Sequence, residues 1–419
     1  MSDPEARVVR STALALVVAG VSLGFAIATA SVYASRTSAQ RGGEKKKLSH
    51  ETWYEASDKD GRISSLDSVR RGALEGGIPQ SLRQDVWPVL LGVRSCSSTS
   101  VEYEQGKRAR RGRYREFHRR CAELEDLLSK PAKGPVNLPT DLASFTEASR
   151  VIANDVPRTT LTYGPFARDW ESGILSSAEN EPMDWQSAQR QRLIRVLEAY
   201  VILDPVIGYT QGMNDLAAVF LRDISNESEA FWCFAKFMGG SYRCHFLINP
   251  HESVRSRHGE SQEGVSDRLR VVGEIIRLVD APMHKHLKFL NAQDCMFALR
   301  PLLVLMSREL ADAEIGFLWD ALIAAGDYEP TIKDGVPLAG GGARLFLHTV
   351  AAALIELRSK IMACRKNDEL MQLVARKLPV RGFKAVDLVH KARDLMKITH
   401  GVGEAMTVVS RATVMLKEL

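Results

Sequence analysis

Apolar side chains recur at helical spacing through almost the whole chain after Trp53, while the strict alternation of a half-buried strand is scarce. In QSLRQDVWPVLLG, for example, Leu82, Val86 and Leu90 share one side of a helix, and Gly92 suits its C-terminal end. The pattern predicts an all-α chain. We expect two of its stretches, CMFALRPLLVLMSREL and IGFLWDALIAAG, to form a buried pair of core helices.

The N-terminal stretch has a different composition. No charged residue occurs in the 25 positions from Ser11 to Ser35, and a helix of about 20 apolar residues is enough to cross a bilayer. We therefore expect residues 1–35 to form a membrane anchor with one transmembrane helix. A cleaved signal peptide and a buried soluble helix or transit segment are the alternatives, because the stretch is only moderately apolar and offers small-residue cleavage sites.

The residues that follow this stretch indicate its orientation. Residues 36–50, RTSAQRGGEKKKLSH, form a basic tether, and such a cationic flank favours the cytosolic side. The six cysteines are scattered without a C-x-x-C pair, which is typical of a reduced compartment. The expected protein is single-pass, with its large domain in the cytosol. An endomembrane is favoured, and the outer membrane of mitochondria or plastids is the alternative.

Several other classes of site are not expected. The formal net charge of +5 is mild, and the basic stretch 106–121 has few interleaved aromatic residues, so we expect no nucleic acid. That stretch is either a solvated helix face or a surface for a membrane or acidic partner. Cys244, His245, His251 and His258 match no zinc spacing. The glycines at 340–342 lack the Lys-Ser/Thr of a phosphate-binding loop. We predict no metal site and no cofactor.

One polar stretch, IANDVPRT, lies at the end of a predicted helix. Pro157 disfavours helical backbone at Val156, so the helix should end near Asp155. Arg158 follows three residues later, within reach of a charge-assisted bond, of single or bidentate geometry, that would direct its guanidinium. On its own, a D-x-x-R pattern is usually an ordinary surface ion pair.

A second polar stretch, GYTQGMNDL, precedes another helix. Gly208 and Gly212 bracket a tight turn that carries Gln211, and the helix should begin at Asn214 or Asp215. On its own, the pattern favours a loop amide that satisfies backbone groups over a catalytic side chain.

Together, the two stretches resemble the I-x-x-D-x-x-R and Y-x-Q-G-M motifs of TBC-type Rab GTPase-activating domains. GGIPQSLRQDVWPVLLG resembles the opening of that domain, with Arg83 and Trp87 at the R-x-x-x-W positions, and FWCFAKFM and FLWDAL resemble later landmarks. The arrangement is most similar to the subgroup with a DKDGRI lead-in. The chain departs from the family at Thr160, Pro301 and Met306, where Asp, Trp and Phe are usual, which bears on packing and substrate choice.

The resemblance implies a TBC-type multi-helix domain in two helical subdomains over residues 51–400, with a core at about 76–325. Residues 401–419 would form a C-terminal tail helix. The implied activity is acceleration of GTP hydrolysis by a GTP-bound Rab-family GTPase, in membrane trafficking. The chain would have no independent active site, since GTP and Mg²⁺ belong to the partner.

The resemblance also implies roles for individual residues. Arg158 and Gln211 would be the two catalytic fingers, and Asp155 would orient Arg158. Tyr209 would support the glutamine turn or contact the GTPase. The alternative function is a non-catalytic, membrane-anchored Rab-binding scaffold or adaptor. Arg83 and Trp87 are expected to be structural or interface residues.

Overall fold

A computed structural model describes residues 47–129, 140–159, 185–240, 242, 264–326, 341–378 and 384–399. Within these ranges the chain is helical, and its β structure is limited to one isolated bridge between Ser57 and Ile63. The prediction of an all-α fold is therefore confirmed.

Three predicted segments fall wholly or largely outside the described residues. These are the membrane anchor 1–35, the tether up to residue 46 and the tail helix 401–419. None of the helices in the described ranges combines the length and the apolar character needed to cross a membrane.

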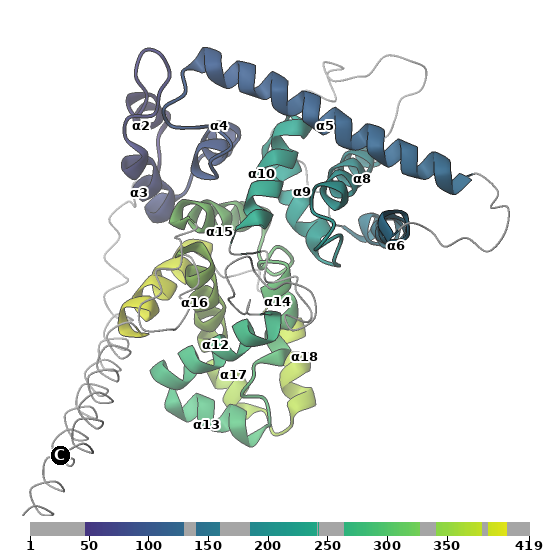
Figure 1. The fold of residues 1–419 in the computed structure, drawn as a ribbon. Coiled ribbons are helices and arrows are strands. Elements are labelled where there is room, and N and C mark those ends of the chain that lie inside the picture. The colour runs from purple at the N-terminus through teal and green to yellow at the C-terminus, as the bar shows by residue number, and fades with distance from the viewer. Residues whose placement is uncertain are drawn as a thin grey trace, which may run out of the picture.

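The helices form two groups in Figure 1, with α15 between them. The upper group comprises α2 (His50–Glu55), α3 (Leu66–Gly76), α4 (Gln80–Leu90), α5 (Ser100–Ser129), α6 (Thr140–Asp155), η1 (Val156–Arg158), α8 (Trp185–Leu203), α9 (Met213–Asp223) and α10 (Glu227–Gly239). α15 spans Asp312–Ala325. The lower group comprises α12 (Val265–Val279), α13 (Ala281–Phe289), η3 (Met296–Ala298), α14 (Leu299–Leu303), α16 (Gly341–Glu356), α17 (Arg358–Ala363), α18 (Asn367–Lys377) and a helix over residues 385–399.

The longest described helix, α5, runs along the edge of the upper group (Figure 1). Its 30 residues give it a length of about 45 Å. It is fastened to α10 by the ion pair between Arg110 and Glu229, at 2.9 Å, and by a bond from the Trp232 indole to the Arg110 carbonyl. Part of the basic stretch therefore stabilises the fold, while Arg108, Arg111 and Arg115 are exposed.

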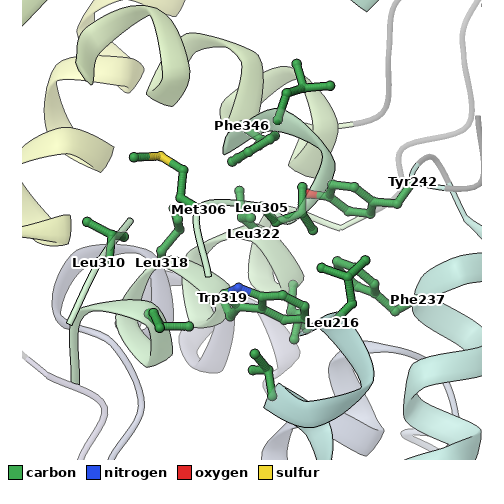
Figure 2. Close-up of a cluster of buried hydrophobic side chains, with 14 of the residues drawn as sticks. Leu216, Phe237, Tyr242, Leu305, Met306, Leu310, Leu318, Trp319, Leu322 and Phe346 are labelled. Atoms are coloured by element: carbon green, nitrogen blue, oxygen red, sulfur yellow. The ribbon is translucent and has the colours of Figure 1, made fainter. Parts of the chain in front are cut away.

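Aromatic and aliphatic side chains together fill the core where the two groups meet (Figure 2). The Trp319 ring of α15 stacks on Phe237 of α10 at a centroid distance of 5.1 Å, and meets Phe220 of α9 edge-on at 5.5 Å. Leu216 of α9 lies in the same cluster as Leu305, which comes from the segment after α14. This packing couples α9 to the C-terminal half of the chain.

One predicted helix is wrong. The stretch CMFALRPLLVLMSREL does not form a single helix, but is divided into η3, α14 and a series of turns. The break lies at Leu305 and Met306, whose φ angles of 46° and 55° are left-handed. Their fully buried side chains explain the break, because packing in the core can outweigh the cost of such a backbone. The spacing of apolar residues does not reveal that core packing at Leu305 and Met306 outweighs the cost of a left-handed backbone.

Candidate functional site

The predicted arginine loop begins where α6 ends, at Asp155, and continues as the short helix η1. The predicted helix end is confirmed. Val156 is buried and anchors the loop to the core, whereas the Arg158 side chain is 67% exposed. The loop thus presents a long cationic side chain on a base that the core holds in place.

Two bonds direct the Arg158 guanidinium. Its Nη2 donates to Oδ1 of Asp155 at 2.9 Å, and its Nε donates to the backbone carbonyl of Asn154, also at 2.9 Å. The Asp155 carboxylate is almost fully buried and engages Arg158 through one oxygen, so the bond is not bidentate to this carboxylate. An exposed arginine held at two points loses less side-chain entropy when it meets a ligand than a free one would.

The glutamine loop connects α8 to α9. Gly208 and Gly212 have φ angles of 60° and 106°, which glycine adopts readily. Gln211 between them is exposed. α9 begins at Met213, with Gly212 as its N-cap, so the predicted start at Asn214 or Asp215 is one to two residues late.

A hydrogen-bonded network joins the two loops. The Tyr209 hydroxyl lies 2.9 Å from Oδ2 of Asp155 and 3.0 Å from Oδ1 of Asn214. Asn214 in turn donates to the Thr159 hydroxyl at 2.8 Å and accepts from the backbone N–H of Gly212 at 3.1 Å. The bases of Arg158 and Gln211 are therefore parts of one connected polar cluster.

The electrostatics of this cluster keep Tyr209 protonated. Burial raises the pKa of its hydroxyl, and the hydrogen bond to Asp155 and the charge of that carboxylate raise the pKa further. Tyr209 is thus a permanent donor at physiological pH. A hydroxyl that stays protonated can hold the Asp155 carboxylate of the other loop by a hydrogen bond.

Asn214 and Thr159 were missed as site residues by sequence reasoning. Both are buried, at 1% and 7% exposure. The available signal was a polar side chain in the first turn of an otherwise apolar helix, MNDLAAVFL. Buried polar groups are normally satisfied by hydrogen bonds, so an asparagine there indicates a partner elsewhere in the chain.

Arg83 and Trp87 of α4 lie apart from this cluster. Their side chains are buried against α15. The Arg83 guanidinium donates to the fully buried carboxylate of Asp320 at 3.0 Å, and the Trp87 indole donates to the same carboxylate at 2.8 Å. Arg83 also lies 3.4 Å from Oδ1 of Asp223 in α9. The geometry gives both residues an internal role in holding helices together.

A glycine inside α15 makes room for this arrangement. A Cβ atom at Gly316 would come within 2.3 Å of the Arg83 guanidinium nitrogens. Burial lowers the pKa of Arg83, but the charges of Asp320 and Asp223 more than offset this effect, so its pKa is raised. Arg83 therefore stays charged in the core.

No group of three or more potential metal ligands occurs among the residues that the structure describes. The sequence cluster of Cys244, His245, His251 and His258 lies outside them. Thr160, one of the departures noted in the sequence, also lies outside.

Comparisons with known proteins identify the family. A sequence model of the family described as "Rab-GTPase-TBC domain" matches residues 80–362. Rab GTPase-activating protein 22 of Arabidopsis thaliana is 26% identical over 75% of this chain and 73% of its own length. TBC1 domain family member 16 of Homo sapiens is 26% identical over 66% of this chain, but over only 31% of its own length.

A solved structure shows the same fold. The crystal structure of the Ypt/Rab-GAP domain of Gyp1p superposes with a TM-score of 0.58 at 17% identity, and covers 83% of this chain and 95% of that one. The family match includes both candidate loops and extends over most of the described helices. The chain belongs to the Rab-GTPase-TBC domain family.

Proposed function

We propose that the protein accelerates GTP hydrolysis by a GTP-bound Rab-family GTPase, with Arg158 and Gln211 acting in the partner's active site. Membership of the family and the printed names of the relatives, such as Rab GTPase-activating protein 22, support the substrate class. The observation that carries the proposal is the Tyr209–Asp155 bond, because it joins the bases of two exposed polar side chains. GTP and Mg²⁺ are bound by the partner.

The proposed chemistry follows from what a small GTPase lacks. Hydrolysis is slow until charge on the transferring phosphoryl group is neutralised and the attacking water is held in line. Arg158 supplies the positive charge, and an arginine in this role is worth roughly 10³–10⁵-fold in rate. The Gln211 amide can accept a hydrogen bond from the water and donate one toward the phosphate.

On binding to the partner's active site, Arg158 would give up one of its two hydrogen bonds within this chain. The two bonds to Asn154 and Asp155 hold the free side chain near the surface. Phosphate oxygens can then replace one of these bonds, while Asp155, fixed by Tyr209, keeps the loop in place. Electrostatic stabilisation of this kind requires that the charge be aimed before the reaction begins.

The test is a hydrolysis assay with the full-length chain in detergent against a panel of GTP-loaded Rab proteins. We expect at least one Rab to be accelerated, and both Arg158→Ala and Gln211→Ala to lose most of that acceleration while still binding the GTPase. If no Rab is accelerated, the proposal fails. Binding of a GTP-loaded Rab without acceleration would instead support the scaffold reading.

We further propose that residues 1–35 anchor the protein so that this domain faces the cytosol. Holding the activator and a lipid-anchored GTPase on one membrane raises their effective concentration without new contacts. The support is the uncharged stretch Ser11 to Ser35 and the basic residues after it. Protease added to intact, sealed membranes should digest the domain. Protection of the domain until the membrane is opened would contradict this topology.

A further inference from the structure

An arginine from the C-terminal half of the chain reaches the first turn of α9. Arg308, in the segment between α14 and α15, contacts Oδ2 of Asp215 through Nη2 at 2.7 Å and through Nε at 3.0 Å. Asp215 is the third residue of α9 and lies four positions after Gln211. The pair thus ties the glutamine turn to a part of the chain that is distant in sequence.

The backbone that presents Arg308 is strained. Leu305 and Met306 both have left-handed φ angles, 46° and 55°, and neither is glycine. Such conformations persist where the surroundings hold them, and they cluster at functional sites. Here the two side chains are buried in the cluster of Figure 2, which also contains Leu216 of α9. The core therefore fixes the turn from which Arg308 projects.

The environment of Asp215 distinguishes this pair from an ordinary surface ion pair. The Asp215 side chain is 6% exposed, whereas that of Arg308 is 43% exposed. By contrast, Arg277 is exposed to a similar extent, 41%, but its partner Glu274 is 58% exposed. A carboxylate that is nearly buried depends on its partner much more than an exposed one does.

The charges around Asp215 point in the same direction. Burial raises the pKa of its carboxyl, the bond to Arg308 and the charge of Arg308 lower it, and the negative charge of Asp155 raises it. Burial is the largest of these effects and the pKa of Asp215 remains raised overall, so Arg308 offsets the burial and the repulsion from Asp155 in part.

We propose that Arg308 is a positioning residue for Gln211, acting through Asp215. The backbone N–H of Asp215 donates to the Gly212 carbonyl at 3.2 Å, so the orientation of this first turn fixes the residue that follows Gln211. Without the Arg308 guanidinium, the Asp215 carboxylate must be solvated by water or become protonated. The first turn of α9 then becomes less rigid. This role rests on the proposed function, because it assumes that Gln211 holds the attacking water.

Arg308→Met in the full chain tests the proposal, with Arg277→Met as the matched control. We expect the maximal GTP hydrolysis rate to fall about tenfold, a factor that corresponds to about 1.4 kcal/mol, with KM unchanged. Asp215→Asn should reproduce the loss, and Arg308→Lys should restore part of it. In a Gln211→Ala background, Arg308→Met should change the rate less than twofold, since the two residues act as a unit.

A measurement on the free protein separates this inference from the proposed function. Amide hydrogen exchange in residues 209–216 should be faster in Arg308→Met than in the parent, and unchanged in Arg277→Met. Unchanged exchange in Arg308→Met overturns the inference, whether or not any Rab is accelerated. A rise in KM at constant maximal rate also overturns it, and would make Arg308 a contact for the GTPase. If no Rab is accelerated, the proposed function fails, and exchange alone decides whether Arg308 holds the turn.

Discussion

The Tyr209 hydroxyl donates to the Asp155 carboxylate across 2.9 Å, although the two residues are 54 positions apart in the sequence. Asp155 uses its other oxygen to hold Arg158. One carboxylate therefore connects the exposed arginine to the loop that carries Gln211. Together with the bond from Asn214 to the Thr159 hydroxyl, this junction links the bases of the two candidate fingers.

Tyr209→Phe should lower the maximal rate of GTP hydrolysis about tenfold, because a hydrogen bond to a charged carboxylate is worth about 1.5 kcal/mol. The phenyl ring retains the packing, so the thermal midpoint should change little. Single-turnover kinetics at saturating activator measure the effect. Tyr54→Phe, at an exposed tyrosine far from the site in sequence, is the control. An unchanged rate would show that the junction does not position the fingers.

Arg158→Lys should be nearly as inactive as Arg158→Ala, with losses on the order of 10²-fold or more. The guanidinium uses two nitrogens at once, for Asn154 and Asp155, and a lysine ammonium on a flexible stem does not reproduce that geometry. The comparison requires hydrolysis rates for both variants together with their affinities for the GTP-loaded partner. Near-parental activity of the lysine variant would mean that charge alone is sufficient.

Arg83→Met should destabilise the fold by about 3–5 kcal/mol, because it leaves the fully buried carboxylate of Asp320 without its cation, whereas Asp223 keeps its ion pair with Arg222. Urea unfolding followed by circular dichroism measures the loss. The control is Arg150→Met, which breaks an exposed pair with Glu147 and should cost less than about 1 kcal/mol. Equal losses in the two variants would contradict the internal role of Arg83.

Glu198 should make stability depend on pH. Burial and the nearby charge of Glu125 raise the pKa of Glu198 from 4.5 to about 7. The folded chain therefore retains a proton that the unfolded chain loses between these values, and this contribution to stability falls as pH rises from 4.5 to about 7.

Glu198→Gln removes that dependence. We expect the free energy of unfolding of the variant, relative to the parent, to increase by about 1–3 kcal/mol between pH 5 and pH 8. Glu125→Gln, which removes the neighbouring charge, should produce a smaller change in the same direction. Parallel pH profiles for the parent and Glu198→Gln would refute this assignment.

The sequence predicted those parts of the fold in which local signals, such as apolar spacing and proline, decide the backbone conformation. The helix α4 and its buried face followed from apolar spacing, and the end of α6 followed from the restriction that Pro157 places on its neighbour. The stretch from 296 to 310 was mispredicted, because the burial of Leu305 and Met306 outweighs their backbone preference. The membrane anchor and the domain boundaries remain predictions.

The sequence by itself determined the helical class and the position of the two loops, since periodicity, proline and glycine act over short distances. Only the tertiary structure decided what surrounds those residues. Tyr209 meets Asp155, Arg83 meets Asp320, and Arg308 meets Asp215 across 54, 237 and 93 positions. Such pairings arise when packed helices bring buried polar groups together and each must find a partner, and no local pattern encodes which partner that is.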